Sequence, residues 1–252
     1  MLNIQQEIEK LRADTGHEVV LFDDHFHPNF RKIVQDLATK AGLTEPLLLV
    51  VLSDDDGAYV YTDFSMLAIT MGELNHNSEA ELALTVGHEI GHVLLPEKTT
   101  LVAGLFWSSL LTFIIGYCGI GLGGGGIKLA NNILHTKPNS LIGVSSAIAA
   151  LGLYGAACRA SCSLEKECDS ISAYITGKAL TGARYYWDKA LQNKKMAVAL
   201  PWYNHYPSLM ERGRNFDDIA NNMDAEGKPI QLQKVPPALR KNSFWLRSIG
   251  IK

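Results

Sequence analysis

Two long stretches without a charged residue constrain this chain more than any other feature of its sequence. Residues 99–127 hold no Asp, Glu, Lys or Arg over 29 positions, and residues 138–158 hold none over 21 positions. A helix needs about 20 apolar residues to span about 30 Å of hydrocarbon, so each stretch is long enough to cross a bilayer. The sequence therefore predicts an apolar two-helix hairpin with a short polar connection between its arms.

The same stretches are also compatible with a buried helical hairpin in a soluble, cytoplasmic protein. In the second stretch small residues stand four apart, such as Gly143 and Ala147, which lets membrane helices approach closely. Two uncharged stretches in succession favour insertion, although Lys128 and Lys137 of the connection would then face the non-cytosolic side, against the usual bias. We expect a multi-pass membrane protein that contacts the lipid bilayer and whose main domain faces the cytoplasm.

The distribution of charge argues against nucleic acid as a partner. Residues 1–98 hold 6 Lys and Arg against 17 Asp and Glu, whereas residues 159–252 hold 15 against 9. This division gives no continuous basic face, and the chain carries no nucleic-acid-binding motif. The 4 cysteines lack the paired spacing of a secreted disulfide framework, which favours a reducing compartment. The N-terminal 16 residues have an amphipathic helical pattern rather than the apolar core of a signal peptide.

Outside the charge-free stretches the pattern alternates between helix and strand, as is typical of an α+β domain. Strands are predicted over residues 18–22, 46–52 and 65–70, and a helix from Phe30 that Gly42 ends. Asp56 and Gly57 predict a hairpin turn after the second strand.

The sequence HEIGH at residues 88–92 lies in a predicted helix. Ser78 followed by Glu81 forms a capping box at its start, and Pro96 stops it after Leu95. In a helix His88 and His92 are one turn apart on the same face. HExxH on a helix is typical of a zinc site in which both histidines are ligands and the glutamate, here Glu89, is the general base.

A catalytic zinc ion requires a third protein ligand and one open position. A second amphipathic helix is predicted to begin near residue 161, with Glu165 and Asp169 four apart on one face. Glu165 is the predicted third ligand, with Glu167 as its nearest competitor, and Asp169 could orient a ligand histidine through its other ring nitrogen. Since the ligands must meet at one ion, the intervening segment has to leave the domain and return to the same side, which two membrane spans achieve.

These motifs, in this order, resemble the integral-membrane zinc metalloproteases of the HtpX and CAAX prenyl protease type. The resemblance rests on HEIGH, two apolar segments, SCSLEKECD at 161–169 and PSLMER at 207–212. It implies a zincin-like peptidase domain with one zinc ion, a role for Arg212 beside the site, and quality control of membrane proteins. Cys162 and Cys168 stand where Arg and Ala are usual in that family; neither position is a ligand there, so no role is expected for either cysteine.

The segment NHYPSLMER departs from the family's pattern before its proline. His205 or Tyr206 is expected to donate a hydrogen bond to the oxyanion, and the residues leave the choice between them open. The predicted domain plan is a peptidase domain in two parts, residues 1–98 with HEIGH and residues 159–252 with the third ligand, separated by the hairpin at residues 99–158.

The sequence thus predicts a membrane zinc endopeptidase that acts on polypeptide substrates. The substrate is expected to bind as an added strand near residues 65–70. Two alternatives stay open: a soluble metalloprotease with a buried hairpin, and a non-catalytic membrane adaptor that retains the fold.

Overall fold

The computed structural model describes residues 4–60, 64–114, 138–192 and 206–251. The chain divides into two compact units. The first unit comprises Met1–Pro96, Glu165–Val198 and Ser208–Lys252, and the second comprises Glu97–Leu164 and Ala199–Pro207. The fold is helix-rich and mixed α+β, as the sequence predicted.

The first unit contains a sheet of four strands in the order β1-β2-β4-β3. Strand β2 (Leu47–Val51) pairs with β1 (Val19–Leu21) in antiparallel fashion and with β4 (Met66–Thr70) in parallel fashion. Strand β3 (Ala58–Val60) pairs antiparallel with β4 and forms one edge of the sheet. All five residues of β4 are buried, as expected for a strand with neighbours on both edges and cover on both faces.

The hairpin predicted at Asp56 and Gly57 is wrong, because β2 and β3 are not neighbours. Strand β4 lies between them, with Leu47 of β2 beside Met66 and Ala58 of β3 beside Ile69. The Gly57 carbonyl instead accepts hydrogen bonds from the amide and hydroxyl of Thr70 at the end of β4. A turn signal shows where the chain reverses, but it does not show which strands pair; here β4, all of whose residues are buried, pairs between β2 and β3.

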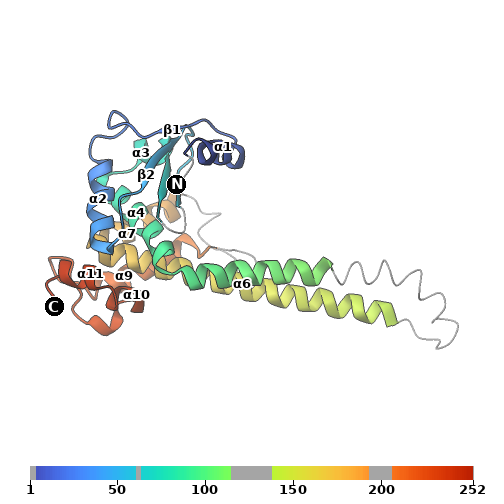
Figure 1. The fold of residues 1–252 in the computed structure, drawn as a ribbon. Coiled ribbons are helices and arrows are strands. Elements are labelled where there is room, and N and C mark those ends of the chain that lie inside the picture. Colours follow the sequence, from blue (N-terminus) through green and yellow to red (C-terminus); the bar gives the residue numbers. More distant parts are fainter. Residues whose placement is uncertain (1–3, 61–63, 115–137, 193–205, 252) are drawn as a thin grey trace. The chain divides into compact units, whose positions relative to one another are not determined.

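Helices cover both faces of the sheet. Ile8 and Leu11 of α1 (Ile4–Thr15) pack on one face in a cluster with Leu49, Val51 and Ala68. In Figure 1, α2 (Phe30–Ala41) and α4 (Glu79–Leu94) lie on the other side of the sheet from α1. Gly42 ends α2 with a left-handed backbone (φ 73°), as its position in the sequence predicted.

The helix that carries HEIGH begins as the sequence predicted. Ser78 and Glu81 form a capping box in which each side chain bonds the other residue's backbone amide, and α4 then runs to Leu94. The short helix α3 (Met71–His76) precedes it. Helix α4 contacts both α2 and the edge strand β3.

Helix α6 (Pro138–Thr176) is continuous over 39 residues, so the helix start predicted near residue 161 is wrong. Residues 159–165, between the charge-free stretch and the third ligand, contain no proline, which would remove a helical hydrogen bond and break the helix. The later helices of the first unit are α7 (Ala179–Gln192), α9 (Leu209–Ala220), α10 (Pro237–Arg240) and α11 (Ser243–Ser248), with the 3₁₀ helix η1 (Leu232–Lys234) before α10.

The second unit contains helical residues 97–114 and the N-terminal part of α6. The two segments contact one another: the Ser109 hydroxyl donates to the Ala150 carbonyl at 2.8 Å, and the rings of Phe106 and Tyr154 meet edge to face. Among the described residues one helical segment, Ala147–Thr176, is long and apolar enough to cross a membrane. The connection with Lys128 and Lys137 lies outside the described residues.

Candidate metal centre

Helices α4 and α6 approach one another very closely in the first unit. A Cβ atom at Gly87 would lie 2.8 Å from the Ser172 hydroxyl, and one at Gly91 would lie 2.8 Å from the Cα atom of Cys168. The Ser172 hydroxyl donates to the Leu84 carbonyl at 2.5 Å and ties the two backbones together. Gly87 and Gly91, one turn apart, therefore allow α4 to pack closely on α6, so that the histidines of HEIGH lie next to side chains of α6.

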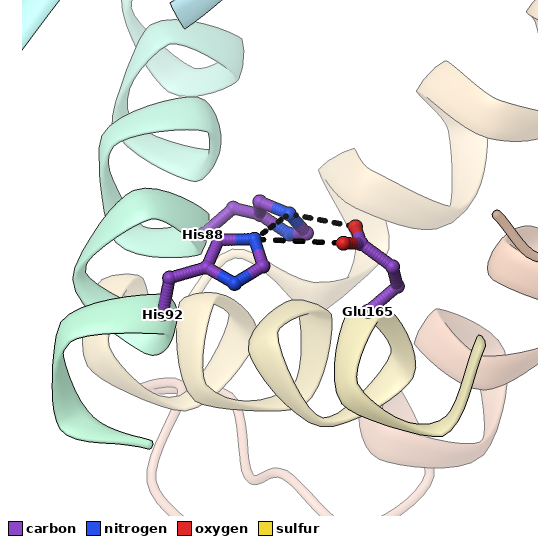
Figure 2. Close-up of side chains that lie close together, drawn as sticks. All are labelled: His88, His92 and Glu165. Atoms are coloured by element: carbon purple, nitrogen blue, oxygen red, sulfur yellow. Dashed lines mark hydrogen bonds and ion pairs between the residues drawn. The ribbon is translucent and has the colours of Figure 1, made fainter. Parts of the chain in front are cut away.

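His88, His92 and Glu165 meet at this contact. Figure 2 shows the two imidazoles of α4 and the carboxylate of α6 pointing toward a common centre. The Nε2 atoms of the histidines are 3.2 Å apart, and Glu165 oxygens lie 3.1 Å from Nε2 of His88 and 3.6 Å from Nε2 of His92. Glu165 is buried at 5% exposure. Among the described residues this is the group of three whose ligand atoms lie close enough to hold one metal ion.

The donor set and its spacing fit a small divalent cation. Tetrahedral ligand atoms about 2.0–2.1 Å from a zinc ion stand about 3.3 Å from each other, and the three separations bracket this value. Two neutral imidazoles and one carboxylate are also the ligand types that zinc accepts, and three protein ligands leave a fourth position open. The residues present therefore fit the ion that HExxH implies.

Asp169 and Arg212 lie behind His88. The Asp169 carboxylate accepts from Nδ1 of His88 at 2.9 Å, and the Arg212 guanidinium donates to both oxygens of Asp169. Arg212 also stacks over the ring of Tyr186, with 4.2 Å to the ring centre. Arg212 reaches this place because Ser208 and Glu211 form a capping box that starts α9. The structure thus brings together five residues that the sequence singled out: His88, His92, Glu165, Asp169 and Arg212.

The sequence reasoning missed a residue at the second histidine. The Sγ atom of Cys168 lies 3.5 Å from Nδ1 of His92, so both outward-facing ring nitrogens have partners on α6. Cys168 is fully buried. Its position three residues after Glu165 on a helix places it on the same face as the carboxylate, which is the signal that could have found it. Tyr186 was also missed, and no spacing in the sequence points to it.

The two histidines differ in their electrostatic surroundings. At His88 burial disfavours the cation, but hydrogen bonds to Asp169 and Glu165 outweigh burial and raise its pKa to about 9. At His92 burial and the neighbouring His88 lower the pKa to about 4, so its imidazole is neutral. A metal ligand must be unprotonated, so an ion that binds here displaces a proton from His88.

Glu89 has the electrostatic character of a general base. It lies between the two histidines on α4 and is partly buried. Burial raises its pKa, the nearby His88 lowers it and Glu165 raises it, and together these effects bring the pKa to about 7. A carboxylate with a pKa close to the working pH can both take up and release a proton.

The two candidates for the oxyanion donor are not placed at this site. His205 lies outside the described residues. Tyr206 belongs to the second unit, and its side chain is 62% exposed. Their role stays a prediction.

Comparisons with known proteins agree with these motifs. The family described as Peptidase family M48 matches residues 25–219. A protein described as "Protease HtpX homolog" from Aeropyrum pernix is 28% identical over 191 residues, which are 72% of this chain and 54% of that protein. Another with the same description, from Pyrobaculum calidifontis, is 30% identical over 115 residues, 42% of this chain and 32% of that protein.

The matched region contains every residue of the candidate metal centre, from His88 to Arg212. The chain spans about half or less of the length of the two curated relatives. The family match covers well over half of the chain, and it confirms the resemblance that the motifs indicated. The chain belongs to peptidase family M48.

Proposed function

We propose that this chain is a zinc-dependent endopeptidase in which His88, His92 and Glu165 hold one zinc ion. The observation that carries the proposal is the convergence of their three donor atoms at 3.1–3.6 Å on a buried contact between two helices. When bound, the ion would supply a Lewis acid that activates water and polarises a peptide carbonyl.

Glu89 carries the proton in the proposed reaction. Its carboxylate takes a proton from the attacking water and delivers it to the amine that leaves. Membership of family M48 and the position of Glu89 between the two histidines both support this role. Asp169 holds His88 with the proton on Nδ1, so that Nε2 is free to act as a ligand. Arg212 in turn fixes the Asp169 carboxylate.

His205 or Tyr206 is proposed to donate to the oxyanion. Removing an oxyanion donor costs about 10²–10³ in kcat while substrate binding persists. Tyr206→Phe and His205→Ala, measured separately, should reveal the donor as the variant whose kcat falls with little change in KM. Equal kcat in both variants and the wild type would exclude both residues.

The substrate is proposed to be a polypeptide that pairs with the edge strand β3. Strand β4, near which the sequence placed the substrate, has β2 and β3 on its two edges and has no edge to offer. Strand β3 has one edge without a partner among the described strands, and it contacts the HEIGH helix. Added strands bind through backbone hydrogen bonds. A peptide methylated at alternate amide nitrogens should bind more weakly than its parent, and equal binding would contradict strand pairing.

The second unit is proposed to be a membrane-inserted hairpin, with the peptidase domain on the cytoplasmic side. Large apolar side chains face solvent on both of its helical segments, including Trp107 at 70%, Leu111 at 58%, Ile148 at 65% and Leu151 at 63% exposure. An apolar surface of this kind is unfavourable in water and marks a membrane or protein contact. The charge-free residues 138–158 supply the length of one span.

Extraction separates the inserted hairpin from a soluble protein. Membranes from cells that express the chain should retain it after an alkaline carbonate wash, which removes peripheral proteins. Release into the wash would favour the soluble alternative. The same membranes, treated with protease from the cytosolic side, should lose the peptidase domain.

The proposed activity is tested at Glu89. Glu89→Gln should retain zinc and lower the rate of peptide cleavage by about 10²–10⁴, because the proton carrier is lost. Glu79→Gln, at an exposed position on the same helix, is the matched control and should cleave like the wild type. If the zinc-loaded wild type and Glu89→Gln are equally inert, the enzyme proposal fails and the membrane adaptor remains.

A further inference from the structure

The two ligand histidines are oriented by different chemical groups. Their Nε2 atoms face one another and Glu165, so the protein can hold each ring only through Nδ1. At His88 that partner is the carboxylate of Asp169, at 2.9 Å. At His92 it is the sulfur of Cys168, at 3.5 Å, which is within the usual reach of a hydrogen bond to sulfur.

The backbone leaves the sulfur little freedom to move away. Cys168 is 0% exposed and lies where α6 touches α4. A Cβ atom at Gly91 would lie 2.8 Å from the Cα and 2.9 Å from the Cβ of Cys168, so the residue before His92 packs directly against this cysteine. The next residue of α6 is Asp169, so one turn of α6 supplies the partners of both rings.

We infer that Cys168 is a positioning residue that holds the His92 imidazole with its proton on Nδ1. A histidine that ligates a metal almost always donates its other ring N–H to an acceptor, which fixes both the tautomer and the ring orientation. A thiol sulfur is a weak acceptor and adds no charge when it is protonated, unlike the carboxylate at His88. Cys168 therefore orients the His92 ring but does not raise its basicity as a ligand. The Asp169 carboxylate does both for His88. This inference rests on the proposed zinc site.

Zinc affinity of the full chain, measured by competition with a chromophoric chelator, tests the role of the sulfur. Cys168→Ala should bind zinc about tenfold more weakly. Loss of a group that hydrogen-bonds a metal ligand typically lowers metal affinity about 10–100-fold, and we expect the low end because sulfur is a weak acceptor. Cys168→Ser keeps an acceptor and should remain within about threefold of the wild type. Cys158→Ala removes another buried thiol from α6 and should bind as the wild type does. A folded Cys168→Ala protein that binds zinc within about twofold of the wild type would overturn the inference.

A measurement on the wild type does not depend on whether a variant folds. In the zinc-loaded chain with ¹⁵N-labelled histidine, the His92 ring should be the tautomer with the proton on Nδ1, and that proton should exchange slowly with water. A freely exchanging Nδ1 proton would overturn the inference. His88→Ala distinguishes failure of the zinc site from failure of the role of Cys168. If both His88→Ala and Cys168→Ala bind zinc like the wild type, the proposed zinc site fails. If His88→Ala loses zinc but Cys168→Ala does not, only the role of Cys168 is refuted.

Discussion

Gly91 packs so closely on Cys168 that a Cβ atom at position 91 would lie 2.8 Å from the Cα atom of the cysteine. This contact sets the distance between the helix that carries His88 and His92 and the helix that carries Glu165. The candidate metal centre exists only while that distance is kept, because its third ligand comes from the second helix. The middle of HEIGH is therefore a packing position as well as part of a motif.

Gly91→Ala should damage packing and metal binding together. The added methyl meets backbone atoms of α6 that cannot turn aside, and overpacking of this kind costs about 1–3 kcal/mol of folding free energy. Thermal unfolding and zinc affinity of the variant should both fall. Gly155→Ala is the matched control on α6, since a Cβ atom there meets nothing within 4 Å. If Gly91→Ala binds zinc like the control, the close approach does not set the geometry of the site.

Asp169→Asn should weaken zinc binding about 10–100-fold, because His88 loses the carboxylate that orients its ring. It should also lower the free energy of unfolding by about 3 kcal/mol, since Arg212 would be left largely buried without its counter-charge. Chelator competition and denaturant unfolding measure the two effects. Asp218→Asn, at an exposed position on α9, is the control. Unchanged zinc affinity in Asp169→Asn would show that the carboxylate serves packing alone.

The parts of the site that the sequence could predict are those set by helical spacing. Ser78 and Glu81 cap α4 as predicted, and a helix with that start places His88 and His92 on one face. Glu165 and Asp169, four apart on α6, both reach the histidines. In each case the relationship depends on residues within one or two turns of a single helix, which sequence periodicity can reveal.

The errors arose where contacts join distant segments. The hairpin at Gly57 failed because β4 pairs between β2 and β3, and a turn signal contains no information on which strand becomes the neighbour. Helical spacing places Cys168 on the same face as Glu165, but it does not show that the sulfur reaches His92. Its contact with His92 depends on how closely two helices pack, and Gly91 determines that spacing.

Removal of the metal should lower the stability of the wild type. An ion that binds only the folded chain adds about 2.7 kcal/mol of folding free energy when its free concentration is 100 times its Kd. Unfolding with excess zinc and with excess chelator should therefore give two distinct midpoints. His92→Ala lacks one ligand, and its midpoint should respond far less. An equal response of the variant and the wild type would place the stabilising zinc elsewhere in the chain.

Glu73 should make the folded state less stable as the pH rises. A carboxylate in an ion pair has the opposite effect, because its stabilisation is lost as the pH falls. Glu73 is 4% exposed and accepts a hydrogen bond from the Thr85 hydroxyl at 2.5 Å. Burial raises its pKa above the ordinary 4.5, Thr85 opposes the shift, and Asp56 adds to it. The folded state thus holds this proton more tightly than the unfolded state. Stability from the protonated form is complete below pH 4.5 and is lost as the pH rises through the folded pKa.

Glu73→Gln keeps the acceptor for Thr85 and removes the charge, so it should unfold at a higher temperature than the wild type at pH 8. The difference between the two proteins should shrink as the pH falls below the folded pKa of Glu73, and it should level off below pH 4.5, where the side chain is protonated in both states. Melting temperatures of both proteins across this range, taken by circular dichroism, measure that difference and cancel the titration of other groups. A gain from Glu73→Gln that does not change with pH would mean that packing, and not the buried charge, determines the effect of this residue.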